Sequence, residues 1–475
     1  KMRFTFFKKF VFYQNLLFIL IIIFLLFCFT LFFSQRILAQ SKNNFVTINK
    51  IKIIIDGQLY VWQNPDNIPE KNDNNFTDPL TIISFLDIKP LEEIEKYKLE
   101  QKLFNIEKNL MTSGYFFTAS AYVVESSKGE NFVNVIIEVT EGFLLRFGGG
   151  SIFGVFGKDN IYGLRKSFLI AIGYNLDGIK YCDEIFLGLN SFINISLFYQ
   201  NDYGFTDIKF NKLDFELDFG YRFKPNLKIS LDSFLSYQNS DILSGLENYF
   251  YDGEFLSISE GIKIQYNYYF FINKTNKSDF YLRGELDIHP SFLFYYGLSD
   301  SVQNLPSNPI FLLNIKKVFV LETKYFSSGF ATYLFYVNNL LDYFNSYNLS
   351  YSQNPFIRTI VAKSQSYPDF SIVTNFELRS PDILIPLGGI FNFQFSIFLF
   401  DDFAFCKFLH KSYQLLPEEF KQNELEVKDN FYFLNAIGIG IRFGFGLPIN
   451  VFFTLTYGFN LNGNGTFILF YGKGF

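Results

Sequence analysis

The sequence is poor in the residues that build crosslinks and metal sites, with 3 Cys and 2 His among 475 residues. Cys28, Cys182 and Cys406 cannot form a disulfide framework. His289 and His410 lie far from any cluster of Cys or carboxylate residues with the spacing of metal ligands. We therefore predict no metal site and no cofactor.

The sequence also lacks an excess of positive charge. Lysine and arginine number 41 against 46 aspartate and glutamate residues, which gives a net charge of -5, and no basic run has the form of a phosphate-tracking segment. Proteins that bind nucleic acid carry a basic patch or stripe. We therefore expect no nucleic-acid partner.

Long apolar runs are scarce as well. Although 49% of the residues are hydrophobic, only Leu16–Phe33 is long and continuous enough to cross a bilayer as a helix. Basic residues precede this run, and Ala39 supplies a small residue before a polar stretch begins. This order is typical of a secretory signal, which we assign to residues 1–40. An uncleaved membrane anchor is the alternative, because the apolar core is long for a signal.

Aromatic residues are abundant, with 67 Phe and 31 Tyr, and they are dispersed along the chain. Such residues fit pleated surfaces and form girdles on membrane barrels. From Phe143 onward, apolar and polar residues alternate. In one segment Leu213, Phe215 and Leu217 share a face opposite Asp214, Glu216 and Asp218, and the same alternation occurs in 279–289, 437–445 and 451–459. A period of two predicts β-strands.

A membrane barrel turns its apolar residues toward lipid and its polar residues toward a lumen, and closes to leave no unpaired edge. We predict a mainly β fold in which residues 143–475 form an antiparallel transmembrane β-barrel of about 16 strands, at roughly 20 residues per strand and connection. A soluble β-sandwich is the alternative. It would turn the apolar face inward instead.

Residues 46–142 have the pattern of a small α+β unit. The β-branched run Ile51–Ile55 is followed by Asp56-Gly57, which indicates a strand and a turn, and a polar stretch at 63–78 indicates a long loop. A helix is predicted where apolar residues recur at helical spacing and a glycine follows: Leu99, Leu103, Ile106, Leu110 and Gly114. Two strands, at 118–125 and 133–139, complete the order strand, helix, strand, strand.

Short motifs follow one another in a definite order. The small unit contains Met111–Phe116, a helix exit with a small residue, Gly and an aromatic, and the closing strand Glu138–Gly142. Later motifs are Phe147–Gly150, Asp159–Gly163, Phe356–Thr359, Asn375–Pro381, Phe398–Asp402, Gly438–Pro448, Val451–Phe459 and Phe467–Phe475. Together they resemble the BamA-like superfamily of outer-membrane assembly and translocation barrels, in which a polypeptide-transport-associated (POTRA) domain precedes the barrel.

This resemblance covers nearly the whole chain after the signal. It implies one POTRA-like domain at 46–142 in the periplasm and a barrel at 143–475 in the bacterial outer membrane. It also implies that the C-terminal aromatic, Phe475, is read by the machinery that assembles such barrels. The assembly factors typically carry several POTRA domains, whereas residues 41–142 leave room for one.

In such barrels an arginine of the sixth extracellular loop folds into the lumen and meets acidic residues on strands 12 and 13. The resemblance makes Arg358 this arginine, although Thr359 and Ile360 stand where the family has Gly and an aromatic. A guanidinium inside a barrel needs acidic partners, because an unpaired buried charge is costly. A solvated loop cation is the alternative role for Arg358.

The alternation of apolar and polar residues along each strand predicts which carboxylates face the lumen. Glu377 shares its face with Asn375 and Arg379, opposite apolar residues, so it should point inward. Asp402 is in phase with the polar face of its strand and is the second expected partner. Asp401 falls on the apolar face and would turn inward only if the end of the strand bulged.

Glycines mark both sides of the seam at which the first and last strands would meet: Gly148, Gly149, Gly150, Gly472 and Gly474. Glycine weakens a strand interior, so both sides of this seam should part easily. In the resembled family an open seam is thought to template incoming strands through an exposed strand edge. The alternative is that these glycines only bend the barrel.

These observations predict a non-enzymatic insertase or translocase whose partners are outer-membrane lipid, unfolded outer-membrane or secreted polypeptides, and periplasmic accessory proteins. A passive channel or structural barrel is the alternative. An enzymatic barrel has little support and no catalytic residue is proposed. The carboxylates expected in the lumen, among them Glu216, Asp218, Glu285 and Asp287, have no Ser-His-Asp spacing around them.

Overall fold

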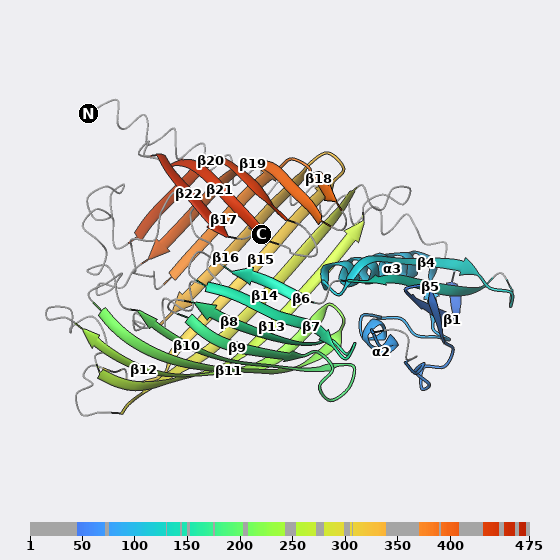
Figure 1. Ribbon diagram of the computed structural model, residues 1–475, viewed down its shortest axis with the longest axis horizontal. Coiled ribbons are helices and arrows are strands. Elements are labelled where there is room, and N and C mark those ends of the chain that lie inside the picture. The colour runs from blue at the N-terminus through green and yellow to red at the C-terminus, as the bar shows by residue number, and fades with distance from the viewer. Residues whose placement is uncertain are drawn as a thin grey trace.

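The computed structural model contains a small sheet in residues 45–141 and a large sheet from residue 145 onward (Figure 1). It describes residues 45–475 except for 72–75, 130, 143–144, 150–152, 174–175, 203–207, 243–252, 272–279, 299–304, 306, 339–369, 389–390, 408–430, 446–450, 461–464 and 472–475. Within this described part of the chain, no helix has the length and apolarity needed to cross a membrane.

The N-terminal unit, residues 45–141, combines one sheet with two helices. Its elements are β1 (Phe45–Ile55), β2 (Gln58–Trp62), α2 (Pro79–Ile83), β3 (Glu93–Glu95), α3 (Lys96–Thr112), β4 (Phe116–Glu125) and β5 (Phe132–Glu141). The strand order is β2-β1-β5-β4, with β3 also paired to β1. β1 runs parallel to β5, whereas β4 is antiparallel to β5. β4 is therefore an end strand of this sheet.

The helix predicted from apolar spacing is confirmed. Leu99, Leu103, Ile106 and Leu110 all lie on the buried face of α3. Gly114 follows the helix with a φ of 77°, in the left-handed region that glycine adopts without a steric cost. The strands β2 and β3 and the short helix α2 were not predicted. α2 begins where the Asp78 carboxylate accepts a hydrogen bond from the Leu80 amide at 2.8 Å.

The large sheet is antiparallel, and its strands are long. They are β6 (Leu145–Gly149), β7 (Phe153–Ile161), β8 (Lys166–Gly173), β9 (Leu176–Asp183), β10 (Ser191–Asp202), β11 (Ile208–Lys224), β12 (Leu227–Ile242), β13 (Gly253–Phe271), β14 (Phe280–Gly297), β15 (Ile310–Thr323), β16 (Ser327–Val337), β17 (Phe370–Arg379), β18 (Ile383–Gly388), β19 (Phe391–Lys407), β20 (Phe431–Phe445), β21 (Val451–Asn460) and β22 (Gly465–Tyr471).

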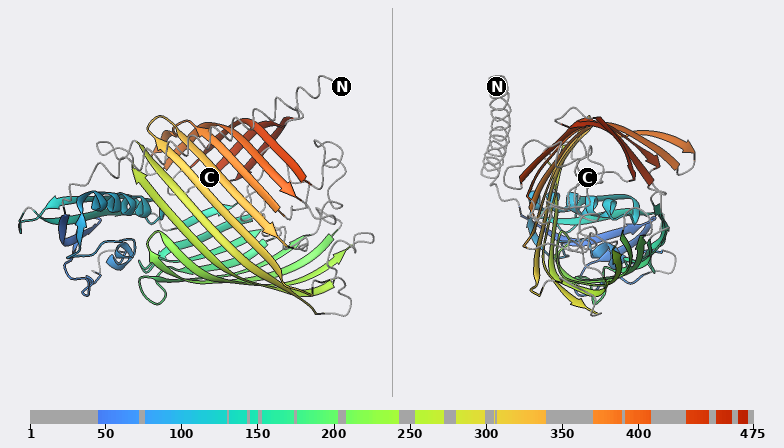
Figure 2. Two further views of the ribbon diagram at one scale, coloured as in Figure 1. Left: turned by 180° about the vertical axis from the view of Figure 1, so that it is seen from behind. Right: turned by 90° about the vertical axis from the view of Figure 1, so that its left-hand side faces the viewer.

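The order of these strands returns to its start, with β22 next to β6 and β9 next to β10 (Figures 1 and 2). β17 and β18 pair with successive halves of β19, so the described strands β6 to β22 fill sixteen positions around the sheet.

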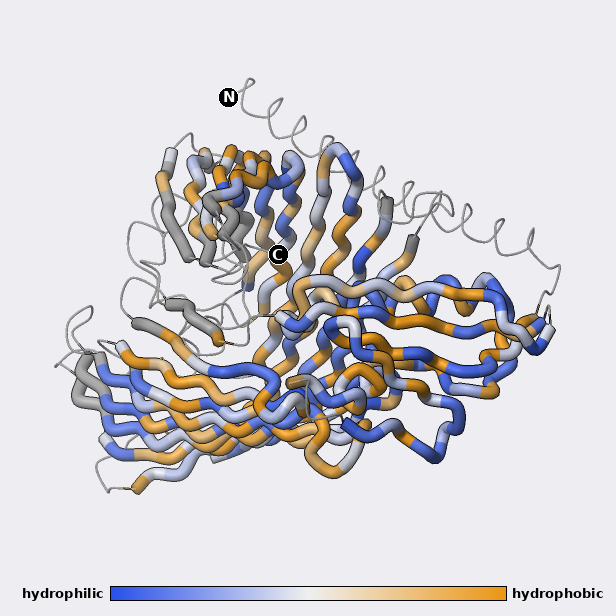
Figure 3. The backbone as a smooth tube through the Cα atoms, turned by 45° about the vertical axis from the view of Figure 1, so that its right-hand side comes forward, coloured by the Kyte–Doolittle hydropathy of each residue, from blue (hydrophilic) through white to orange (hydrophobic). Residues whose placement is uncertain are grey.

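The distribution of side chains in the large sheet is the reverse of that in a soluble protein, with apolar residues outside and polar residues inside. Phe215 and Ile439 on the outside are 37% and 48% exposed, whereas Asp214 and Asp218 on the inside are buried. Apolar and polar residues alternate along the strands (Figure 3). A soluble sandwich would show the opposite arrangement. The outward face is thus suited to an apolar surrounding and the inward face to water or to polar partners.

The N-terminal unit lies at one end of the large sheet (Figure 2). Seen end-on, it lies behind the opening that the strands surround. The buried core of the unit includes Ile48, Ile53, Leu103 and Ile137, and Leu189, from the connection between β9 and β10, packs against this core. The two parts of the chain therefore share an apolar contact.

Candidate functional site at the junction of the N-terminal unit and the large sheet

The connection between β7 and β8 carries the closest contact between the two parts. Gly163 has a φ of 72°, and its carbonyl oxygen accepts hydrogen bonds from the Asp78 amide at 3.2 Å and from the Thr81 hydroxyl. A Cβ at this position would lie 2.1 Å from the Phe76 carbonyl oxygen. Only glycine therefore fits here, for both its backbone conformation and the close approach.

Asn160, near the end of β7, holds the same connection in place through side-chain hydrogen bonds. Its side-chain amide donates to the Thr77 hydroxyl at 2.9 Å, and its side-chain oxygen accepts from the Arg165 amide at 2.9 Å. Both Asn160 and Thr77 are buried. Buried polar groups are costly unless they are hydrogen-bonded, so these bonds favour one docked arrangement.

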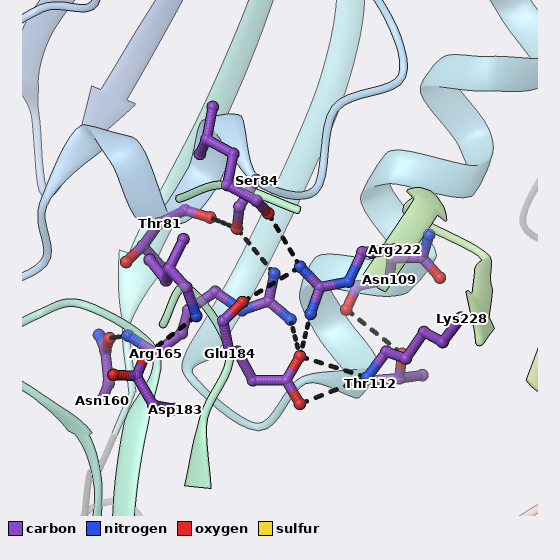
Figure 4. Close-up of polar contacts among 12 residues, drawn as sticks. Thr81, Ser84, Asn109, Thr112, Asn160, Arg165, Asp183, Glu184, Arg222 and Lys228 are labelled. Atoms are coloured by element: carbon purple, nitrogen blue, oxygen red, sulfur yellow. Dashed lines mark hydrogen bonds and ion pairs between the residues drawn. The ribbon is translucent and has the colours of Figure 1, made fainter. Parts of the chain in front are cut away.

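Arg165 extends from the large sheet into the N-terminal unit (Figure 4). Its guanidinium donates to the Ser84 hydroxyl at 2.7 Å and lies 3.9 Å from the centre of the Phe85 ring. Ser84 and Phe85 directly follow α2. The planar guanidinium can stack on an aromatic ring and donate at its edge in the same position. Arg165 therefore links the two parts through one side chain.

Glu184 is the shared anion of a cluster with three cations, Arg165, Arg222 and Lys228 (Figure 4). The distances from its Oε2 atom are 3.1 Å to Arg165 and 3.2 Å to Lys228, and Arg222 is in direct hydrogen-bonding contact. Glu184 follows β9, Arg222 lies near the end of β11, and Lys228 lies at the start of β12. Three connections of the sheet therefore converge on one carboxylate.

The electrostatics of the cluster are dominated by burial and by these cations. Burial alone raises the pKa of Glu184, but Lys228, Arg165 and Arg222 outweigh it and lower the pKa to about 2. The Phe192 ring lies 5.2 Å from Lys228 Nζ and 5.9 Å from Arg222 Cζ. These ring contacts help to offset the excess of cations over carboxylates.

Helix α3 makes a second contact, with β13 and β14. Gln101 donates to the Tyr269 carbonyl oxygen at 2.7 Å, and the Phe104 and Tyr281 rings meet edge to face at 5.7 Å. Lys108 Nζ lies 4.4 Å from the centre of the Tyr281 ring. The N-terminal unit thus contacts the same end of the sheet from β7 to β14, through Arg165 and the β7–β8 connection at one side and through aromatic rings at the other.

Two of the predicted lumen carboxylates lie on the inward face. Glu377 accepts hydrogen bonds from Arg379 and, at 3.4 Å, from Arg442. Asp402 is fully buried and accepts from the Asn375 side chain at 2.8 Å. Their orientation follows the alternation in the sequence. Their pairing with Arg358 stays a prediction, because Arg358 lies outside the described residues.

Asp401 requires a correction. It lies on the outward face, opposite the exposed residues Phe376 on β17 and Ile437 on β20, and it accepts a hydrogen bond from Asn435 at 2.9 Å. A bulge would have been needed to turn it inward, and the pairing of β17 with β19 runs without a shift in register. Asp401 is therefore not a lumen residue.

The seam residues are only partly described. Gly148 and Gly149 lie in β6, where they pair with Val155 and Gly154 of β7. Gly150, Gly472, Gly474 and Phe475 lie outside the described residues, as does the predicted signal at 1–40. The role of these glycines stays a prediction.

Sequence reasoning missed the cluster around Glu184. Asp159–Gly163 was recognised as a motif, but no pattern connected it or Arg222 to the N-terminal unit. Glu184 and Lys228 are single charged residues beside turns, and such residues are usually solvated. Only the observation that three turns lie at one end of an antiparallel sheet could have suggested that their charges meet.

The fold is thus a large antiparallel sheet with inverted side chains and a small α+β unit docked at one end. No family model and no curated protein matches the sequence. Among solved structures, the chain is similar to BamA from Haemophilus ducreyi lacking POTRA domains 1–3, at 12% identity and a TM-score of 0.42, covering 90% of this chain and 83% of that one. It is also similar to CdiB from Escherichia coli, at 10% identity and a TM-score of 0.46, covering 90% and 75%.

Proposed function

We propose that this protein is an outer-membrane insertase or translocase for polypeptides, with residues 143–475 spanning the membrane as a barrel and residues 46–142 acting as a POTRA-like periplasmic domain. The observation that carries the proposal is the docking of an α+β unit at one end of a sheet with inverted side chains. A simple pore needs no such unit. A protein that receives polypeptides needs a surface beside its opening on which they can bind.

The end strand β4 offers that surface. An end strand leaves a row of backbone N–H and C=O groups available, and an extended polypeptide can pair with them as an added strand. The junction with the large sheet involves α2, α3 and the loop before α2. None of these contacts between described residues comes from β4, so we infer that a client could bind there without undocking the unit.

The junction of β22 and β6 fits the same proposal. Gly148 and Gly149 lie in β6, and glycine weakens the interior of a strand, so this seam should separate at a lower cost than a pair of strands without glycine. A strand entering the membrane could then pair with either freed edge. Clients, accessory proteins and the location in the outer membrane are parts of this proposal.

Depletion of the protein, followed by proteomics of the outer membrane and of secreted proteins, tests the function. We expect a reduced level of a subset of other barrels or secreted proteins. An unchanged profile would refute the proposal. A variant in which a pair of introduced cysteines joins β6 to β22 should have the same effect as depletion if the seam must open, and addition of a reductant should restore the profile.

A passive channel is the second candidate, favoured by the charged lumen. Inward-facing pairs such as Lys212–Asp214 at 3.1 Å and Lys316–Glu285 at 2.5 Å would line a water-filled path. Conductance of the purified protein in planar bilayers, with and without residues 41–142, discriminates between the two. A large steady pore in the full chain favours the channel, whereas a closed full chain favours the insertase or translocase.

A further inference from the structure

The outward face of the large sheet carries several polar side chains among its apolar ones, including Lys317 and the pair Ser233–Glu260. Asp401 and Asn435 form another such pair, in an apolar setting. Leu399 and Phe403, the neighbours of Asp401 on the same face of β19, are 54% and 38% exposed. Ile437, opposite Asp401 on β20, is 58% exposed. An ionisable residue that faces lipid is costly, and such residues commonly mark functional sites.

The pair has hydrogen-bonding capacity left over. Asn435 donates one N–H to Asp401 Oδ1 at 2.9 Å. The carboxyl group of Asp401 can accept several hydrogen bonds, and the carbonyl oxygen of Asn435 can accept two more. Within the described residues the pair therefore has more acceptors than donors, and a ligand that supplies a donor would be favoured in an apolar surrounding.

The surroundings of the pair fit an acyl chain. Asp401, Asn435 and Thr374 are half-buried among longer apolar side chains, and Thr374 pairs directly with Phe403. The outer wall of a barrel is convex, so a second folded protein would touch it along a narrow line and would rest on the longer side chains. A flexible chain can instead pass between the longer side chains and reach the polar pair.

The position of Asp401 along β19 indicates at which depth of the membrane the hydrogen-bond donor of a lipid would lie. Asp401 lies toward the end of β19 at Lys407, and Phe403 and Phe405 lie between them on the same face. Aromatic residues gather at the membrane interface. The pair is thus just inside the apolar belt, at the depth of the first carbons of an acyl chain.

We propose that Asp401 and Asn435 bind a lipid whose acyl chain carries a hydroxyl or amide group near its headgroup. The proposal rests on the proposed function, because it requires that the sheet span a membrane. The lipid hydroxyl donates to Asp401 and the chain packs along Leu399, Phe403 and Ile437. No covalent step is involved.

Retention of lipid by the full chain tests this proposal. The protein is placed in phosphatidylcholine discs that contain equal amounts of two lipids with the same headgroup, one with a 3-hydroxyacyl chain and one with the plain chain. Native mass spectrometry then measures which lipid stays bound. We expect a preference of about tenfold for the hydroxylated lipid, the effect of one hydrogen bond in lipid.

The variant carrying Asp401→Leu and Asn435→Leu should lose this preference, and Ile437→Leu, which keeps the polar pair, should retain it. Equal retention of both lipids by the unaltered chain, or a preference that persists in the double variant, would overturn the site. Failure of the chain to enter the discs at all would instead count against the proposed function, so the two outcomes are distinguishable.

Discussion

Replacement of Glu184 by glutamine is the most direct test of the junction. The substitution keeps the shape of the side chain but removes the charge shared by Arg165, Arg222 and Lys228. The cations outweigh burial and lower the pKa of Glu184 from 4.5 to about 2. At 1.36 kcal/mol per pKa unit, this corresponds to about 3 kcal/mol of stabilisation of the folded cluster, whose four members all belong to the large sheet. Docking depends on the cluster through Arg165, which contacts Ser84 and Phe85 of the N-terminal unit. Loss of one partner from a buried ion pair has a similar cost.

Glutamine leaves Arg165 without its carboxylate partner and so less firmly held against Ser84 and Phe85. We expect docking to weaken by about 1 kcal/mol, which raises the ratio of undocked to docked molecules roughly fivefold. The Asp78 amide, which donates to Gly163 across the junction, reports this change. Hydrogen exchange of a peptide that covers Asp78 should therefore lose protection roughly fivefold in Glu184→Gln. Glu285→Gln, which removes a carboxylate paired with Lys316 inside the sheet, serves as the control. Equal protection in both variants would refute the reasoning.

Three further predictions concern the same junction. Gly163→Ala should undock the unit, because its Cβ would meet the Phe76 carbonyl oxygen. Gly57→Ala, at a position that also has a positive φ but lies in open space, should only cost backbone strain of about 1 kcal/mol. Hydrogen exchange at the Asp78 amide should lose protection in the first variant and not in the second. Tyr281→Leu should weaken docking by about 1 kcal/mol through loss of its contacts with Phe104 and Lys108, as measured in a double-mutant cycle with Lys108→Met. Because the folded pKa of Glu184 is lowered, its stabilisation of the cluster, including the position of Arg165, is complete above about pH 4.5 and is lost as the pH falls toward about 2. Normalised protection at Asp78 should therefore be equal at pH 7 and pH 5 and decline below about pH 4.5, with no decline from this source in Glu184→Gln.

The sequence by itself determined the features that repeat at fixed spacing. A period of two in segments such as 213–218 identified the strands and placed Phe215 outside and Asp214 inside, because successive side chains of a strand point to opposite faces. The same rule placed Glu377 and Asp402 on the inward face. Helical spacing identified α3 and its buried face. These properties depend on residues a few positions apart and need no knowledge of the partner strands.

The tertiary structure alone decided which residues meet across long distances. Arg165, Glu184 and the paired residues Arg222 and Lys228 come from three separate connections, and their convergence depends on the register of every strand between them. The unshifted pairing of β17 with β19 placed Asp401 outside, although a bulge in one strand would have reversed it. Local periodicity fixes the face of a side chain, whereas register and docking fix its neighbours, and these arise only when the whole sheet is assembled.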